Sequence, residues 1–403
     1  MILMLLPDRK VTYLLGDAAA FEKHVFCPYD SLVCEFLSDL SNNLMHDSVA
    51  KTFSDVMAFA FFCRKANIMR LKKEFFETRA RLGLGIVFHI TPSNIPVNFA
   101  FSYVFGLLAG NSNIVKLPPK TFPQAISIIS AVERVLSAEK YHKISESTVF
   151  MQYDPDDNLT SLFSSVCDAR IIWGGDETIK TIRRVPVPVR SIDIAFADRY
   201  SFCVMSAEAV CRLDKQELRR LSACFYNDTY VMDQNACSSP HLIVWLGESA
   251  ESSAASLRFW QSLYEETAVR YTFNPVIAVD KLTVLCENAI DYPFVAGVKR
   301  YENLLYVIKL SSLPESVDLF RGKCGYFYEY CAASLDVIAP IINKKVQTIT
   351  YYGVSREALK SFVDEYQPQG VDRFVPVGSA LNISVIWDGY DLVRTLSRII
   401  DIG

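Results

Sequence analysis

The chain has 403 residues, enough for two or three domains with hydrophobic cores of their own, so it needs no metal or disulfide to fold. Its 41 lysines and arginines are outnumbered by 45 aspartates and glutamates, which gives a formal net charge of -4 at pH 7. Because no basic excess is present to neutralise a phosphate backbone, we do not expect a nucleic-acid partner. Hydrophobic residues make up 51% of the chain, with only 16 glycines and 17 prolines, which excludes a disordered or collagen-like protein.

The first ten residues, MILMLLPDRK, contain an apolar run of six residues that ends at a proline. This run is shorter than the apolar core of a secretory signal peptide, so we expect no cleaved leader. The eleven cysteines are odd in number, and no two of them have C-x-x-C spacing. Both features favour reduced thiols over a disulfide framework, and we therefore expect a cytoplasmic protein.

Residues 82–115 contain no Asp, Glu, Lys or Arg, which gives them the hydropathy of a membrane span. Pro92, Pro96 and several asparagines interrupt the stretch, so no apolar run reaches the roughly 18 residues that a spanning helix needs. We expect this stretch to be buried inside the protein, without integral membrane association.

Residues before 80 are predicted to be mainly helical, and from residue 84 onward predicted strands and helices alternate. The strands are predicted at 84–90, 113–117, 148–154 and 169–173, and the helices between them at 98–110, 124–138 and 159–166. This series predicts a mostly parallel sheet with helices on both faces, which binds ligands at the carboxyl ends of its strands. A nucleotide-binding domain is the leading interpretation.

A second alternation of strands and helices spans residues 206–350, and a helix is predicted at 355–366. Ser355 can cap this helix, and apolar residues follow it at helical spacing. No internal repeat or Gly/Ser-rich linker separates the parts of the chain, so we expect interleaved domains.

Four segments combine small, polar and nucleophilic residues in positions suited to chemistry. They are HITPSNIP (89–96), GNSNIVKLPPK (110–120), RIIWGGDETIK (170–180) and DQNACSSP (233–240). Their order and separation resemble those of the aldehyde dehydrogenase superfamily.

Two further segments narrow this resemblance, which covers residues 80–403. GVDRFVPVGSALNISVIWDGYDLV (370–393) and FADRYSFCVM (196–205) are similar to the long-chain acyl-protein thioester reductases. That family is typified by the reductase subunit of the bacterial bioluminescence fatty acid reductase complex.

The resemblance implies an aldehyde dehydrogenase-like α/β fold with two interleaved, doubly wound parallel-sheet domains, one for nucleotide binding and one for catalysis. We expect residues 1–205 to hold the helical region and the NAD(P)-binding domain. Residues 206–352 would form the catalytic domain, and 353–403 a segment that returns toward the nucleotide-binding or oligomerisation region.

The resemblance also implies that Cys237 is the nucleophile and that Asn94 stabilises the oxyanion. A thiolate suits this task because it attacks a thioester readily and later leaves readily, and a fixed amide can donate to the carbonyl oxygen as charge develops there. Two structural alternatives remain open. Cys237 can be one of several buried, inert cysteines, and Asn94 can simply turn the chain between two prolines.

An absent carboxylate bears on the direction of the reaction. Oxidative aldehyde dehydrogenases carry a Glu roughly 35 residues before the nucleophile as the base that activates water, and the region 196–205 has none. An enzyme that reduces an acyl-thioester must avoid hydrolysing it, so this absence favours reduction, with Asp198 as a possible substitute base.

For the cofactor, the resemblance places Lys116 at the adenosine ribose. Pro119 stands where NAD-preferring members carry a Glu, and Lys120 follows it, so we expect NADPH. A small-residue turn would open a helix beneath the pyrophosphate, unless it is an ordinary strand-to-helix turn. This turn consists of Gly174, Gly175 and Asp176.

Three further points complete the expectations. His241 can donate a proton to the departing thiol or be structural, and Glu329 departs from the superfamily's ribose-binding pattern. No histidine or cysteine spacing suits zinc or iron, so we expect no metal.

The expected reaction is NADPH-dependent reduction of a fatty acyl thioester to a fatty aldehyde through an acyl-cysteine. Two alternatives are a short-chain CoA-acylating aldehyde dehydrogenase and a non-catalytic scaffold subunit of an acyl-transfer complex. The expected acyl donor is acyl-CoA, or else a partner protein of the acyl-carrier or acyl-protein synthetase kind. We also expect the chain to form a homo-oligomer.

Overall fold

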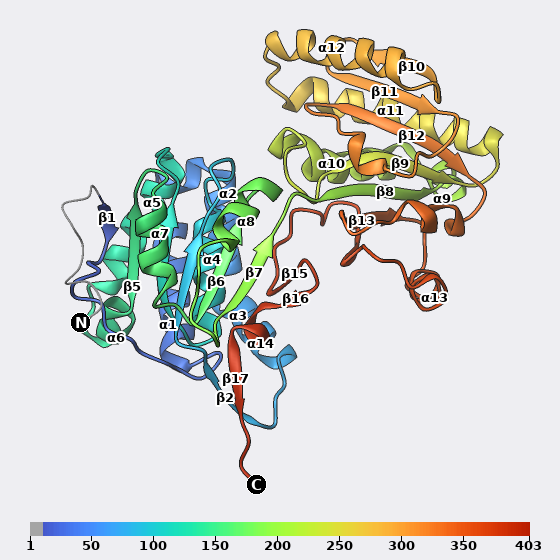
Figure 1. Ribbon diagram of the computed structural model, residues 1–403. Coiled ribbons are helices and arrows are strands. Elements are labelled where there is room, and N and C mark those ends of the chain that lie inside the picture. The colour runs from blue at the N-terminus through green and yellow to red at the C-terminus, as the bar shows by residue number, and fades with distance from the viewer. Residues whose placement is uncertain (1–10) are drawn as a thin grey trace. The chain divides into compact units, whose positions relative to one another are not determined.

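The computed structural model describes residues 11–403, and the apolar run at the start of the chain lies outside them. The described residues form two compact units. Unit 1 contains the residues up to Ala197 together with Ile383–Gly403, and unit 2 contains Asp198–Asn382. Because unit 1 is built from both sides of unit 2 in the sequence, the expected interleaving is confirmed (Figure 1).

The boundaries of the units differ from the expected ones. Strand β8 (Tyr200–Ser206) pairs with β9 and β13 in the second sheet, so the expected boundary at 205 lies too late. Strand β14 (Arg373–Pro376) also belongs to that sheet, and the return to unit 1 therefore begins at 383 rather than 353. Both strands are held there by backbone hydrogen bonds to their neighbours, which local sequence patterns do not reveal.

Unit 1 is built on a six-stranded sheet in the order β1-β5-β4-β3-β6-β7, and only β1 runs antiparallel to its neighbour. The strands are β1 (Thr12–Leu15), β3 (Ile86–Ile90), β4 (Ser112–Leu117), β5 (Thr148–Gln152), β6 (Ala169–Trp173) and β7 (Ile192–Phe196). All five residues of β3 are buried, as expected for a parallel strand covered on both faces. The four predicted strands are confirmed.

Helices cover both faces of this sheet. On the face that carries Val87 and Val115, here called the α5 face, the core includes residues of α1 (Ser31–His46), α2 (Ser54–Phe62), α3 (Lys65–Glu74), α4 (Asn98–Leu108), α5 (Pro123–Leu136) and α6 (His142–Glu146). On the face that carries Phe88 and Ile114, here called the α7 face, the covering helices are α7 (Asp157–Ser164) and α8 (Asp176–Arg183). The doubly wound arrangement predicted from the sequence is confirmed.

Helix α4 explains the uncharged stretch at 82–115. Every residue of α4 is buried, between the sheet and the N-terminal helices, so its sequence is apolar on all sides. Within residues 11–403, no helix combines the length and hydropathy needed to cross a membrane.

The C-terminal segment completes unit 1. It contains β15 (Ile386–Trp387), β16 (Tyr390–Asp391), α14 (Leu392–Thr395) and β17 (Ser397–Ile400). Strand β17 pairs antiparallel with β2 (Ala80–Gly83), so the red C-terminal strand lies beside the blue β2 in Figure 1. Arg81 fastens this pair, because its guanidinium donates to the carbonyl oxygens of Arg394 and Ser397.

Unit 2 is built on a seven-stranded sheet in the order β10-β11-β12-β9-β8-β13-β14, in which only β10 is antiparallel. Its remaining strands are β9 (Pro240–Leu246), β10 (Val295–Tyr301), β11 (Leu305–Leu310), β12 (Tyr326–Ala332) and β13 (Val346–Tyr352). Its helices are α9 (Ala207–Arg212), α10 (Lys215–Thr229), α11 (Ser249–Arg270), α12 (Val276–Asp291) and α13 (Arg356–Tyr366). The helix predicted at 355–366 is α13, and Ser355 caps it by accepting from the Ala358 N–H.

Buried His89 makes the stability of unit 1 sensitive to pH. Its ring bonds to the Ser102 hydroxyl and the Asn113 amide, and burial lowers the His89 pKa to about 4. An unfolded histidine binds a proton near pH 6.5, so stability is complete above that pH and falls as pH drops toward 4.

The wild type should lose on the order of 3 kcal/mol of its free energy of unfolding through His89 as the pH falls. We predict that His89→Gln abolishes this pH-dependent loss, whatever the stability of the variant at neutral pH. Urea unfolding between pH 4.5 and 7 measures it, with exposed His142→Gln as the control. An unchanged pH slope in His89→Gln would contradict the assignment.

Candidate active site

Cys237 lies in unit 2, in the turn between the short helix η3 (Tyr230–Met232) and β9, at the amino end of that strand. It is half-buried, and the turn is closed by the Ser239 N–H, which donates to the Ala236 carbonyl oxygen at 2.9 Å. We call residues 233–239 the Cys237 loop.

Gln234 clamps the Cys237 loop to β12. Its buried amide nitrogen donates to the carbonyl oxygens of Pro240 and Tyr326, and its oxygen accepts from the N–H groups of Gly325 and Tyr326. Asp233 and Gln234 both have positive φ, 50° and 57°, a conformation that costs a non-glycine residue about 1 kcal/mol or more. The clamp therefore holds a strained backbone that the loop alone would not keep.

Two serines fix the rest of the Cys237 loop. The Ser201 hydroxyl on β8 donates to the Cys237 carbonyl oxygen at 2.7 Å, and the Ser239 hydroxyl donates to the Asp228 carbonyl oxygen at the same distance. The thiol of Cys237 therefore extends from a backbone that is held on both sides.

Asp228, at the end of α10, joins the loop to a distant turn. Its carboxylate accepts from the N–H groups of Gly378 and Ala380 at 2.6 and 2.9 Å, and burial raises the Asp228 pKa to about 6. The sequence did not reveal Ser201 or Asp228 as supporting residues, although the VGSALN segment that Asp228 binds belongs to the resemblance noted above.

All eleven cysteines are free thiols. Burial raises the thiol pKa of seven of them, which keeps them protonated at neutral pH. These are Cys34, Cys63, Cys167, Cys203, Cys224, Cys324 and Cys331.

His241 is buried and lies parallel to the Tyr200 ring, with 5.4 Å between the ring centroids. Burial, together with the charges of Arg321 and Lys323, lowers its pKa to about 3. The imidazole is therefore neutral near pH 7, which favours the structural alternative over an acid that protonates a leaving thiol.

Asp198, the candidate base, and Glu329, compared with a ribose-binding residue, both have hydrogen-bond partners within the protein. Asp198 accepts from the Arg321 guanidinium at 2.8 Å, in an ion pair that is open to solvent. Glu329 on β12 is buried, and one of its oxygens accepts from Trp245, Ser256 and Trp260. Glu329 therefore serves the core of unit 2.

In unit 1, Asn94 is exposed in the loop between β3 and α4. The loop is anchored at its start by Thr91, whose N–H and hydroxyl both donate to the Lys116 carbonyl oxygen. Among residues 11–403, no hydrogen bond engages the Asn94 side chain, so its amide remains available to a ligand. Cys237 belongs to the other unit.

Lys116 and Lys120 border different faces of the first sheet. The Lys116 ammonium lies 4.8 Å from the Tyr153 ring centroid on the α7 face, where burial lowers its pKa and the Asp154 carboxylate opposes that shift. Lys120 is exposed, stacks on Phe122 and lines an apolar hollow beside α5. The sequence, which places both near one ribose, did not reveal this separation.

The turn made of Gly174, Gly175 and Asp176 follows β6 and begins α8. It lies on the α7 face, the same face as Lys116. Gly175 has φ -68° and ψ 163°, which any residue can adopt, and an added methyl group there would meet no atom within 4 Å. Neither backbone nor packing requires this glycine, so the turn leaves an open space at a helix N-terminus. A pyrophosphate fits such a space.

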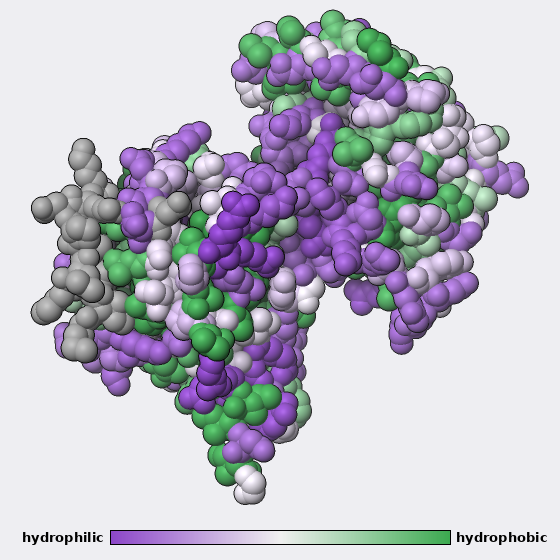
Figure 2. All heavy atoms as spheres, viewed as in Figure 1, coloured by the Kyte–Doolittle hydropathy of each residue, from purple (hydrophilic) through white to green (hydrophobic). Residues whose placement is uncertain are grey.

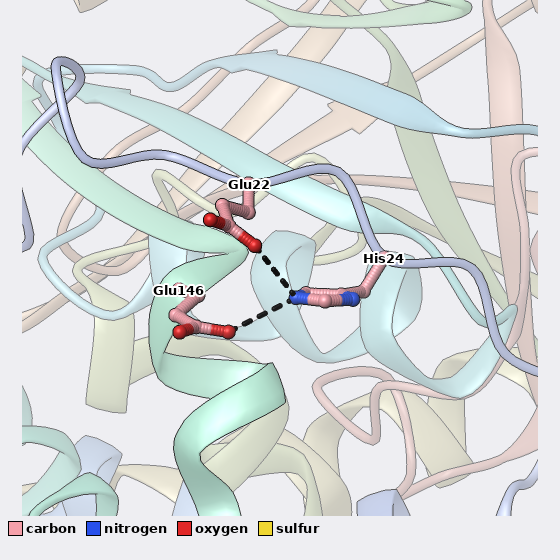
Figure 3. A group of neighbouring side chains, drawn as sticks. All are labelled: Glu22, His24 and Glu146. Carbon is pink, nitrogen blue, oxygen red and sulfur yellow. Dashed lines mark hydrogen bonds and ion pairs between the residues drawn. The ribbon is translucent and has the colours of Figure 1, made fainter.

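One group of three potential metal ligands occurs within residues 11–403, and it lies apart from these sites on the surface of unit 1. Figure 3 shows that Glu22 and Glu146 both point toward the His24 ring, at 3.9 and 3.1 Å from Nε2. Two of the three residues are exposed, and the shortest contact is a hydrogen bond between His24 Nε2 and the Glu146 carboxylate.

Two curated relatives are similar to the chain. The long-chain acyl-protein thioester reductase of Vibrio harveyi is 24% identical over 326 residues, and that of Aliivibrio fischeri is 22% identical over 331 residues. Each match covers 78% of this chain but only 63% of the relative.

The solved structures that resemble the chain are aldehyde dehydrogenases. The glyceraldehyde-3-phosphate dehydrogenase GapN of Methanocaldococcus jannaschii superposes with a TM-score of 0.62 at 12% identity, covering 92% of this chain and 88% of its own. Lactaldehyde dehydrogenase of Escherichia coli gives 0.60 at 11% identity, covering 92% and 86%. At this identity the likeness shows the fold alone, and it confirms the expected aldehyde dehydrogenase-like architecture.

The model of one protein family, described as acyl-CoA reductase (LuxC), matches residues 67–400. This range includes the Asn94 loop, the α8 turn, the Cys237 loop and the C-terminal return to unit 1. The chain therefore belongs to the acyl-CoA reductase (LuxC) family.

Proposed function

We propose that the chain reduces a fatty acyl thioester to a fatty aldehyde through an acyl group carried on Cys237. The observation that supports it most directly is the Cys237 loop, whose strained backbone is held by Gln234 and Ser201 so that one thiol has a fixed position. The relatives named as acyl-protein thioester reductases support the substrate class. The donor would be acyl-CoA or an acylated protein.

The proposed reaction balances as two transfers. The Cys237 thiolate attacks the thioester carbonyl, the bond to the donor sulfur breaks, and that thiolate leaves and takes a proton from solvent. When bound, a nicotinamide cofactor would supply the hydride that adds to the acyl carbon. The resulting thiohemiacetal oxygen reforms a carbonyl, the carbon–sulfur bond breaks, and aldehyde and Cys237 thiolate separate.

Asn94 is proposed to stabilise the oxyanion in both transfers. Its exposed amide, without a hydrogen-bond partner among the described residues, can donate to that oxygen, which we expect to lower the barrier by a few kcal/mol. Asn94 belongs to unit 1 and Cys237 to unit 2.

Reduction is favoured over hydrolysis because residues 196–205, where oxidative aldehyde dehydrogenases carry the water-activating Glu, contain no Glu. Asp198, the candidate substitute, is paired with Arg321, and Glu329 is locked in a core of tryptophans. Neither carboxylate is placed to remove a proton from water attacking an acyl-cysteine.

The proposed cofactor site is on the α7 face of the first sheet. Lys116 would bind the adenosine ribose, and Gly174, Gly175 and Asp176 would receive the pyrophosphate. We propose NADPH because no carboxylate stands at position 119 to repel a 2′-phosphate, and because the GapN neighbour is complexed with NADP. Asp154 beside Lys116 acts against this preference, so cofactor titration is the decisive test.

We predict that Cys237→Ala abolishes labelling by a radioactive long-chain acyl-CoA and leaves the NADPH Kd unchanged, because nucleophile and cofactor use different units. Cys27→Ala, at another accessible thiol, should keep full labelling. Persistent labelling of Cys237→Ala would refute the nucleophile assignment. An unlabelled wild type would favour the scaffold alternative, and preferential labelling by acetyl-CoA would favour a short-chain enzyme.

Gly175→Ala should weaken NADPH binding at least about tenfold, because the methyl group occupies the space proposed for the pyrophosphate. Folding should lose no more than about 1 kcal/mol, since the backbone and the surroundings accept alanine. Gly297→Ala is the matched control, because a methyl group there also meets no atom within 4 Å. Fluorescence titration measures both constants, and an unchanged Kd in Gly175→Ala would mean that no phosphate approaches this turn.

The two lysines should differ in their effects. Lys116→Ala should raise the Kd of both NADPH and NADH about tenfold or more, as expected when a charged hydrogen bond to the ribose is lost. Lys120→Ala tests whether Lys120 reaches the 2′-phosphate from the other face of the sheet, which would raise the NADPH Kd alone by about fivefold, and by less at high salt. Lys360→Ala on α13 is the control. If Lys120→Ala leaves the NADPH Kd unchanged, Lys120 belongs only to the hollow beside α5.

A further inference from the structure

Helix α12 of unit 2 is apolar on its outer side. Five residues at three-to-four spacing form one exposed line along it, which we call the α12 stripe. They are Val276, Val279, Leu282, Cys286 and Ile290, and the four aliphatic members are exposed to 63%, 65%, 48% and 83%. Figure 2 shows green side chains gathered over this helix, next to purple ones.

The inner side of α12 carries the two buried residues of the helix, and both are polar. The Lys281 ammonium donates to the carbonyl oxygens of Leu304 and Cys324 at 3.2 and 2.9 Å. The Asn288 amide donates to the hydroxyls of Tyr326 and Tyr328 at 2.8 and 2.6 Å.

These bonds fix the rotation of the helix about its axis. Turning the α12 stripe inward would leave buried donors and acceptors unpaired, at about 1–3 kcal/mol each. Val284 and Leu285 of α12 are half-buried and pack against the core, so the outward stripe is a second apolar surface that the fold keeps exposed. A continuous exposed apolar line of this kind marks an interaction surface.

An acidic line runs beside the α12 stripe. Asp280, Glu287 and Asp291 are exposed and follow one another at seven and four residues, which puts them on one flank of the helix. Among the described residues, none of the three takes part in an ion pair. Their negative charge is available to whatever covers the stripe.

This flank decides between possible occupants. A second copy docked through α12 in an antiparallel pair across a twofold axis would bring acidic flank against acidic flank. An anionic membrane surface would be repelled in the same way. A protein element with apolar side chains bordered by Lys or Arg matches both the stripe and the flank.

We propose that the α12 stripe and its acidic flank dock an amphipathic helix of a partner protein whose apolar face is bordered by basic residues. The partner is defined by this chemistry: its apolar residues would pack on the α12 stripe, and its basic residues would lie over Asp280, Glu287 and Asp291. The inference stands on unit 2 alone and does not depend on the proposed reaction.

The test uses the full chain and two fluorescent probe peptides of about 18 residues. One alternates Leu and Lys at helical spacing, and the other replaces each Lys by Glu. Anisotropy gives the Kd of each peptide at low and high salt. We expect the Leu–Lys peptide to bind at least about tenfold tighter than the Leu–Glu peptide and to weaken with salt.

Matched variants locate the binding. The double substitution Val279→Asp and Ile290→Asp should abolish binding of the Leu–Lys peptide, whereas Val189→Asp, at an exposed valine of unit 1, should not change it. Replacing the three acids of the flank by their amides should weaken binding several-fold and remove most of its salt dependence.

Cysteine footprinting on the wild type gives an independent readout. Cys286 lies in the stripe and Cys27 lies in unit 1, and these are the exposed thiols among the eleven. The Leu–Lys peptide should protect Cys286 from iodoacetamide and leave Cys27 reactive, as mass spectrometry of the two sites can measure.

Several results would overturn the proposal. Equal binding of the two peptides would show that basic residues of the partner are not recognised. Unchanged binding by the aspartate double variant would show that the peptide does not bind at the α12 stripe. A wild-type dimer that this variant dissociates would assign the face to a second copy. Binding of phosphatidylcholine vesicles that protects Cys286 would assign it to a membrane.

Discussion

Both units depend on one constraint: a parallel strand covered on both faces must satisfy its backbone polar groups through its neighbours, and it can carry a polar side chain in its interior only where that side chain finds hydrogen-bond partners. Strand β3, buried along its whole length, shows the rule in unit 1. The loops that carry Asn94 and Gly175 therefore follow strand ends, and Cys237 precedes one. The chemistry is confined to short loops whose shape the sheets hold.

The Cys237 loop shows how such a loop is kept in a demanding conformation. Two successive residues with positive φ are tolerated because the Gln234 amide satisfies four backbone groups on both sides of it. Asp228 extends this support to the turn at 378–380. A position for one thiol is thus specified by hydrogen bonds between segments that lie far apart in the sequence.

This explains what the sequence could predict. Strands such as 169–173 and the capped helix after Ser355 were predictable because periodicity and caps are local. The separation of Lys116 from Lys120 was not predictable, since it depends on which face of the sheet the chain turns toward after β4 has ended, between the two lysines. The unit boundary was also misplaced, because β8 looks like any buried strand until its partners are known. The relation between Asn94 and Cys237 belongs to the same class of long-range property.

The return of residues 383–403 to unit 1 has a consequence for how the chain folds. Leu392, Val393 and Leu396 are fully buried in the core of unit 1, and β17 supplies the partner of β2 from more than 300 residues away. Loop closure over such a distance is slow and entropically costly. During synthesis, part of the apolar surface of unit 1 therefore stays exposed, and β2 stays unpaired, until unit 2 and the residues that follow it have been made. Unit 2, which is continuous in the sequence, has no such delay.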